Sequence, residues 1–129
     1  MPEKLITQRQ LRVGEEIRHI LAKSLLHGRS GSSLLDNTSI TITEVRVSPD
    51  LQNATVYFMP LAGEKTRDTL AALKEKAGYF RQEVAKNLHT RKAPRLFFHM
   101  DSSFEEAERI EKLLNSPKVQ RDLKENKPE

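Results

Sequence analysis

The chain has 129 residues, a formal net charge of +4 and no cysteine, which suits a single domain with short tails. The lack of cysteine excludes disulfides and cysteine-ligated zinc sites. The sequence has no H-E-x-x-H metal motif, no apolar run long enough to cross a bilayer and no secretory signal pattern. We therefore expect no metal or other cofactor, no membrane contact, and a soluble, cytoplasmic, monomeric protein.

The first predicted element is an amphipathic helix that ends near His27. Its apolar residues recur at spacings of three and four from Val13 to Leu25, and charged residues occupy the other face. The string Gly28-Arg29-Ser30-Gly31 should end the helix. It matches the Gly-x-x-Gly loop that clamps nucleic-acid backbone in KH domains. That clamp joins two helices, whereas here we predict a strand after the loop, so we interpret the string as a flexible connector.

Two strands are predicted next. The segment from Thr38 to Val47 is dense in β-branched residues. Its alternation changes phase between Ile42 and Val45, which indicates a bulge. Ser48-Pro49-Asp50 is typical of a tight turn, because proline fixes φ for the reversal. Residues 53–59 then alternate as a returning strand.

A long helix is predicted after Pro60. Its apolar stripe keeps helical spacing and runs past Gly78. The stripe consists of Leu70, Leu73, Ala77, Phe80, Val84 and Leu88. Glycine inside a helix costs about 1 kcal/mol relative to alanine, so Gly78 needs a packing, kinking or functional reason. Pro94 should end this helix, since the residue before a proline is pushed out of the helical region.

The remaining sequence predicts a short strand and a last helix. Residues 96–100 are the strand, and serines 102 and 103 have capping-box spacing to the glutamates that follow, with the helix reaching about Leu114. Residues 1–8 and 115–129 are expected to be flexible or disordered ends. Residues 9–114 then form an α+β domain of order α-β-β-α-(kink)-α-β-α, whose three-stranded sheet carries helices on one face.

Charge is distributed unevenly along the chain. From Lys74 to Arg95, seven cations and two acids give a net charge of +5, and from Asp101 to Glu111, five acids and one arginine give −4. A polyanion attracted by the first segment would be oriented by the second. The cations of the basic segment are Lys74, Lys76, Arg81, Lys86, Arg91, Lys92 and Arg95.

Gly78 lies in the middle of this basic segment. On a continuous helix, Lys74, Gly78 and Arg81 share one row. The small side chain would let a phosphate backbone approach closely, and a break at Gly78 would free amide donors at a new helix N-terminus. The alternative is a solvated basic face whose glycine serves tight packing against the sheet. Composition alone leaves both interpretations open.

Other functional patterns are weak or missing. The five phenylalanines, Phe97 among them, lie at patterned core positions or beside them, so we expect no stacking platform of the RRM type. Tyr79 is the aromatic residue that could stack on a base. The histidines lack neighbours suited to acid–base catalysis, and no glycine loop with lysine and Ser/Thr is present. We therefore do not expect an enzyme.

An ordered set of motifs resembles the bacterial ribosome-binding factor A family over roughly Arg9 to Leu114. The motifs are Arg12-Val13, Ile42 to Leu51, Ala54 to Tyr57, Ala72-Leu73, Ala77 to Arg81, Arg91, Pro94 to Phe98 and Asp101 to Ser103. The resemblance implies a type II KH-like fold in which an interhelical kink of Ala-x-Gly form replaces the Gly-x-x-Gly clamp. By position, Gly78 is the glycine of that kink, and Lys76 occupies the alanine position.

The resemblance also implies a function. It is that of a non-catalytic assembly factor, which binds the 30S ribosomal subunit and 16S rRNA late in assembly, aids maturation of the 16S 5′ region and matters in the cold. We predict that the cations from Lys74 to Arg95 neutralise rRNA phosphates, that Gly78 permits close approach and that Arg9 and Arg12 extend the surface. Contacts to backbone and shape should dominate over base reading.

Two other functions remain open at this stage. The first is a protein-interaction module whose acidic C-terminal helix binds a basic partner, such as a ribosomal protein or another assembly factor. Phosphate binding weakens steeply with salt, which separates RNA binding from this alternative. The second is a small RNA hydrolase, which would need an acid–base or metal cluster that the sequence does not show.

Overall fold

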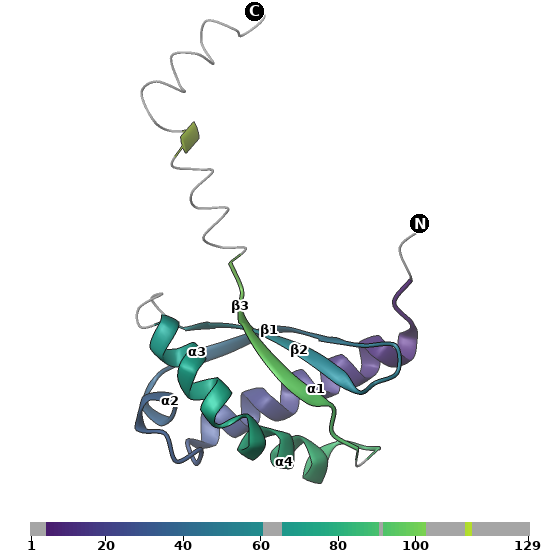
Figure 1. Ribbon diagram of the computed structural model, residues 1–129, viewed down its shortest axis with the longest axis horizontal. Coiled ribbons are helices and arrows are strands. Elements are labelled where there is room, and N and C mark those ends of the chain that lie inside the picture. Colours follow the sequence, from purple (N-terminus) through teal and green to yellow (C-terminus); the bar gives the residue numbers. More distant parts are fainter. Residues whose placement is uncertain (1–4, 61–65, 91, 103–112, 115–129) are drawn as a thin grey trace, which may run out of the picture.

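Helices α1 to α4 lie on one face of a three-stranded sheet in the computed structural model of the protein (Figure 1). The structure describes residues 5–60, 66–90, 92–102 and 113–114. Its elements are α1 (Gln8–His27), α2 (Ser33–Asn37), β1 (Ile40–Val47), β2 (Asn53–Pro60), α3 (Thr66–Glu75), α4 (Ala77–Asn87) and β3 (Arg95–Met100). The predicted α+β class with a three-stranded sheet is confirmed.

Strand β2 is the centre of the sheet. It pairs antiparallel with β1 and parallel with β3. The register of β1 against β2 shifts between Ile42 and Glu44, which confirms the predicted bulge. Alternate residues of β2 (Ala54, Val56 and Phe58) are fully buried under the helices. The intervening residues therefore face the opposite side of the sheet.

Helix α1 is fixed to the sheet at its first turn. The Thr7 hydroxyl accepts a hydrogen bond from the Gln10 amide at 3.1 Å, and the Thr7 amide donates to Gln10 Oε1 at 2.9 Å. This capping box satisfies amides that a helix start otherwise leaves unpaired. The buried Gln10 Nε2 also donates to the Val47 carbonyl at 2.9 Å. The start of α1 is thereby held against the end of β1.

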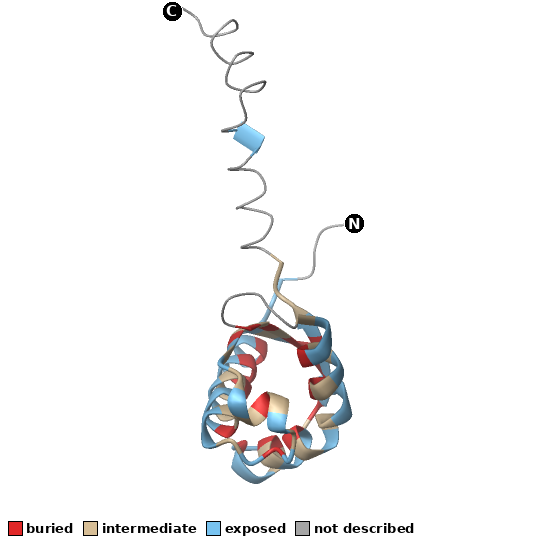
Figure 2. Ribbon diagram, turned by 90° about the vertical axis from the view of Figure 1, so that its left-hand side faces the viewer, coloured by how far each residue is buried: buried red, intermediate tan, exposed pale blue. Residues whose placement is uncertain are grey.

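The core lies between α1, the α3–α4 pair and the sheet, where the buried residues face inward (Figure 2). Burying a large apolar side chain stabilises the fold by roughly 1.5–3 kcal/mol, so this layer supplies most of the stabilising free energy. The largest fully buried apolar side chains are Phe58, Phe80, Ile17, Leu21, Leu35, Leu73, Val56 and Val84. Gly14 lets the backbone of α1 lie close against β1, because a Cβ there would lie 2.5 Å from the Val45 carbonyl oxygen.

A short helix follows the glycine loop, so the prediction of a strand directly after Gly28–Gly31 is wrong. Helix α2 begins after Ser32, whose hydroxyl accepts a hydrogen bond from the Leu35 amide at 3.3 Å. The Leu35 side chain is only 1% exposed. Burial of this one leucine and the serine cap outweigh the weak helical signal of so short a segment. The strand then starts at Ile40 rather than at Thr38.

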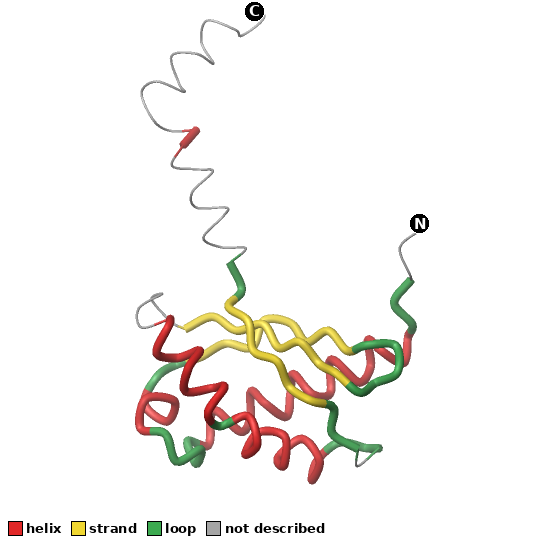
Figure 3. The backbone as a smooth tube through the Cα atoms, viewed as in Figure 1, coloured by secondary structure: helices red, strands yellow, loops and turns green. Residues whose placement is uncertain are grey.

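The long predicted helix is two helices, and the break lies at Lys76 rather than at Gly78 (Figure 3). Lys76 has φ −96° and ψ 13°, outside the helical geometry. Backbone hydrogen bonds still flank the break, from the Lys76 amide to the Ala72 carbonyl at 3.0 Å and from the Phe80 amide to the Lys76 carbonyl at 3.1 Å. The interruption is therefore a local change of direction between two packed helices.

Helix α4 ends at Asn87, so the prediction that Pro94 ends it is wrong. Leu88 is extended, with ψ 137°, and its side chain is 3% exposed. Burial of Leu88 turns the chain away from the helix axis before the proline is reached. Pro94 instead precedes β3, where a residue without an amide donor is tolerated.

Two predictions concern residues that the structure does not describe. The last predicted helix lies outside the described residues except for Leu113 and Leu114, which are helical, and Arg91 also lies outside. No described helix has the length and apolarity that crossing a membrane requires.

The contact at Gly14 leads to a stability prediction. Gly14→Ala should lower the free energy of unfolding by about 1–3 kcal/mol, because the new carbon meets backbone that cannot rotate away. Gly78→Ala is the matched control, since an added Cβ there meets nothing within 4 Å. Gly78→Ala should instead raise the free energy of unfolding by about 0.4–1 kcal/mol. Urea unfolding followed by circular dichroism measures the free energy of unfolding of both variants. An unchanged value for Gly14→Ala would contradict the close packing of α1 on β1.

Candidate nucleic-acid interface

A groove at one end of the molecule brings together four of the predicted RNA-binding residues. It has a volume of about 620 Å³ and lies between the start of α1, the β1–β2 turn and the segment that joins α4 to β3, at the right of Figure 1. We call it the basic groove. Its lining residues are Arg9, Val13, Asp50, Leu51, Gln52, Arg81, Thr90, Lys92, Ala93 and Arg95.

The basic groove has a strong positive charge. Its cations, Arg9, Arg81, Lys92 and Arg95, are all exposed. Four cations and the single acid Asp50 give a net charge of +3. Within the described ranges, the ion pairs join other residues, so no carboxylate neutralises these four. Like charges gathered in a concave site focus the potential and attract anions.

Arg81 is positioned by the backbone of the segment before β3. Its Nε and one terminal nitrogen donate to the Ala93 carbonyl at 3.4 and 3.3 Å. These contacts hold the guanidinium against the wall of the groove. Arginine has five N–H donors in a planar fork, so further donors remain available to a phosphate.

Asp50 orders the β1–β2 turn instead of pairing with the cations. Its carboxylate accepts hydrogen bonds from the Ser48 hydroxyl at 2.6 Å and the Gln52 amide at 3.1 Å. These bonds, the one from Ser48 above all, lower the pKa of Asp50. Leu51 adopts a left-handed conformation with φ 60°, and the Arg95 amide donates to the Gln52 carbonyl at 2.8 Å. The turn thereby places Arg95 beside the groove.

The other predicted site residues lie elsewhere. Lys74 lines a second groove of about 460 Å³ along β3, so the predicted single row of Lys74, Gly78 and Arg81 on one helix is not formed. The ammonium of Lys76 lies over Gly31, 3.3 Å from the position that a Cβ would occupy there. Arg12 on α1 and Lys86 on α4 are exposed and line neither groove. Arg91 is outside the described residues.

Gly78 is open to solvent in the first turn of α4. Apart from the neighbouring residues and backbone of its own helix, no heavy atom lies within 4 Å of an added Cβ, which contradicts the interpretation that this glycine serves tight packing. The amides at the start of a helix have no intrahelical acceptor and attract anions. The break at Lys76 creates such a start two residues before Gly78. Close approach of a ligand backbone is therefore sterically possible here.

One wall of the basic groove is not predicted by the sequence pattern. The turn residues Asp50, Leu51 and Gln52 lie far from the basic segment in sequence and carry no charge pattern of their own. Only the pairing of β2 with β3 brings them beside Lys92 and Arg95. The sequence therefore predicts a turn here, but no local pattern indicates that the turn lines a basic groove.

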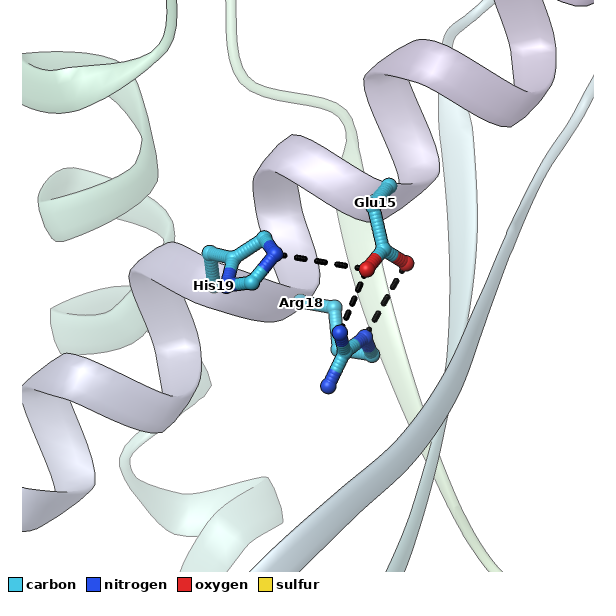
Figure 4. A network of polar contacts seen from close by, with 3 residues as sticks. All are labelled: Glu15, Arg18 and His19. Atoms are coloured by element: carbon cyan, nitrogen blue, oxygen red, sulfur yellow. Dashed lines mark hydrogen bonds and ion pairs between the residues drawn. The ribbon is translucent and has the colours of Figure 1, made fainter.

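Helix α1 carries a separate polar cluster on its exposed face (Figure 4). The Glu15 carboxylate accepts from Arg18, with an Nε to Oε2 distance of 3.0 Å, and pairs with His19 Nε2 at 3.3 Å. The bond from Arg18 lowers the pKa of Glu15. Exposed pairs at this spacing contribute little to stability. The part of the chain that the structure describes has no group of three or more His, Cys, Asp or Glu residues able to hold a metal ion.

Comparison with known proteins gives the family. Residues 9–114 match the family model described as ribosome-binding factor A. The chain belongs to the ribosome-binding factor A family. The ribosome-binding factor A of Afipia carboxidovorans is 53% identical over 117 residues, which cover 91% of this chain and 83% of that protein. The one of Bradyrhizobium diazoefficiens is 47% identical over 120 residues, which cover 93% and 83%.

Solved structures support the fold of the family. A Thermotoga maritima protein described as a ribosome binding factor A superposes with a TM-score of 0.62 at 28% identity, covering 78% of this chain and 94% of that one. Ribosome-binding factor A of Thermus thermophilus has a TM-score of 0.59 at 21% identity, covering 70% and 94%. The KH-like fold implied by the motifs is confirmed.

The hydrogen bonds of Asp50 predict a pH dependence of stability. Because its pKa is lowered in the folded state, its contribution is present above the ordinary value of 3.8 and is lost as pH falls through the folded value. Asp50→Asn should therefore be less stable than the parent at about pH 6, and the difference should shrink toward about pH 3. Chemical unfolding at both pH values measures this.

A second variant isolates the cause. In a Ser48→Ala background, Asp50→Asn should show a much smaller pH-dependent difference, since the Ser48 hydroxyl is the main cause of the lowered pKa. An Asp50→Asn difference that stays constant with pH in the parent would refute the assigned role of the carboxylate.

Proposed function

We propose that this protein binds the small ribosomal subunit through 16S rRNA and acts as an assembly factor in its late maturation, including that of the 16S 5′ region. The curated relatives are named as ribosome-binding factors. The observation that carries the proposal is the basic groove, where cations from α1, α4 and the approach to β3 meet without carboxylate partners among the described residues. Ribosomal RNA supplies the dense phosphate charge that such a groove attracts.

The proposed binding mode is recognition of backbone and shape. Arg9, Arg81, Lys92 and Arg95 contact phosphates in the groove. Gly78 admits backbone near the start of α4, where a Cβ would meet nothing. Contacts to phosphates carry no sequence information, so position along the rRNA is set by geometry. The cations that extend the surface beyond the groove are Lys74, Lys76, Lys86, Arg91 and Arg12.

The protein acts by binding alone under this proposal. It is a cytoplasmic monomer without cofactor, in which residues 9–114 form the RNA-binding domain. Basic ribosomal proteins or other assembly factors are secondary partners, drawn to the acidic residues after Asp101.

Salt dependence tests the groove directly. Replacing Arg9 and Lys92 by glutamine removes two phosphate contacts, so binding to small subunits should weaken and the slope of log K against log salt should become shallower by about 1.4–1.8. Lys23→Gln with Arg67→Gln is the matched control, because it removes the same charge from exposed positions outside the groove. Co-sedimentation at several salt concentrations measures the slope. Equal slopes for the two double variants would rule out the groove as the RNA site.

The absence of catalysis is tested separately. Incubation of the full chain with precursor 16S rRNA and magnesium should leave the RNA length unchanged on a denaturing gel. Catalysed hydrolysis requires a positioned acid–base or metal set. Cleavage that disappears when the protein is heat-denatured would contradict the proposed non-enzymatic role and favour the hydrolase.

A further inference from the structure

The face of the sheet that points away from helices α1 to α4 carries aromatic residues on two neighbouring strands. The β2 residue Tyr57 pairs in register with His99 of β3, and Thr55 pairs with Phe97. These residues alternate with Val56 and Phe98, which are buried on the helical side. Tyr57, Phe97 and His99 therefore share the opposite side, which we call the open face.

Two rings of the open face lie close together, and Phe97 and His99 are exposed whereas Tyr57 is half-buried. The centroids of Tyr57 and His99 are 6.1 Å apart, and their planes are tilted by 37°. Phe97 is 47% exposed, in contrast to Phe98 at 3%. The sequence pattern places every phenylalanine at or beside the core, which predicts no stacking platform. The exposure of Phe97 removes the basis of that expectation.

Cations border these rings. The Arg46 guanidinium lies 5.6 Å from the centroid of the Tyr57 ring, and its Nε donates to Glu44 at 3.0 Å. Arg95 begins β3, two residues before Phe97 on the same side of the strand, and also lines the basic groove. The open face is thereby continuous with the basic groove through Arg95. Glu44 lies in register with Tyr57 on the neighbouring strand β1, and its charge is paired with Arg46.

We infer that the open face binds single-stranded RNA, with unpaired bases stacked on Tyr57 and Phe97 and the phosphate backbone running past Arg95 into the basic groove. Aromatic rings beside arginine offer unpaired bases both stacking and charge attraction. Bases in a duplex are already stacked and cannot reach these rings. The inference rests on the proposed function, because it names the conformation that the bound RNA takes at this surface.

Tyrosine emission reports on this surface. The chain has two tyrosines and no tryptophan, so the full-length Tyr79→Phe variant leaves Tyr57 as its only tyrosine. A short mixed-sequence single-stranded RNA should quench its emission, corrected for RNA absorbance, whereas a duplex of equal length should not. Unchanged emission at saturating single-stranded RNA, with binding shown by filter retention, would overturn the inference.

Substitutions of Phe97 separate stacking from simple apolar contact. In the same background, Phe97→Leu should weaken binding of single-stranded RNA about tenfold, and Phe97→Tyr should retain it, since a base stacks on an aromatic ring and not on leucine. Thr41→Ala is the control, because Thr41 is an exposed residue of β1 that pairs with Met59 away from the rings. Thermal unfolding verifies that the variants are folded. Equal affinity of Phe97→Leu and Phe97→Tyr would overturn the inference.

Binding of the variants to small ribosomal subunits separates this inference from the proposed function. The groove variant with Arg9→Gln and Lys92→Gln tests the proposed function, and Phe97→Leu tests the open face, so the two can fail independently. If Phe97→Leu lost binding to small subunits but kept full affinity for single-stranded RNA, the open face would be a protein-binding surface and the inference would be wrong. Parallel loss of both supports stacking on rRNA.

Discussion

The close contact of α1 with β1 determines where everything else lies. A backbone carbonyl of β1 occupies the space where any side chain larger than that of Gly14 would have to be. Helix α1 therefore lies directly on the sheet, and the side-chain amide of Gln10 donates a hydrogen bond to the Val47 carbonyl. That bond fixes the first turn of α1 beside the β1–β2 turn. Arg9, on the same first turn, is thereby placed in the groove rather than left on a free helix end.

The break at Lys76 has a comparable effect on the other side of the groove. Leu73 before the break and Phe80 after it are both buried, at 0% and 1% exposure, so both helices keep their apolar faces on the core. The Phe80 ring packs edge-on against Phe98 of β3, with centroids 6.1 Å apart. Helix α4 then runs toward the segment before β3, where Arg81 meets the Ala93 carbonyl. The direction of α4, more than its charge, makes Arg81 part of the groove.

Much of the fold could be predicted from the sequence because its signals are local. The period of α1, the alternation of the strands and the phase change at the bulge each depend on neighbouring residues, and the family motifs implied the KH-like arrangement. The errors all involve tertiary contacts. Burial of Leu35 stabilises α2, burial of Leu88 ends α4 early, and the sheet turns Phe97 outward. The four cations of the basic groove are brought together by the packing of α1 on β1, the direction of α4 and the pairing of β2 with β3, which no charge count along the chain could reveal.

The long sequence separation of the groove walls makes completion of the basic groove depend on folding. The Glu16 carboxylate accepts the His89 amide at 2.7 Å, a contact that spans 73 positions near the groove. The wall that contains Lys92 and Arg95 is in place only when β3 has paired with β2, so a partly synthesised chain presents no complete groove. A ligand that binds only the folded state stabilises it by RT ln(1 + [L]/Kd), about 2.7 kcal/mol at a hundredfold excess over Kd. Under the proposed function, a small domain of this kind gains resistance to unfolding and proteolysis whenever RNA occupies the basic groove.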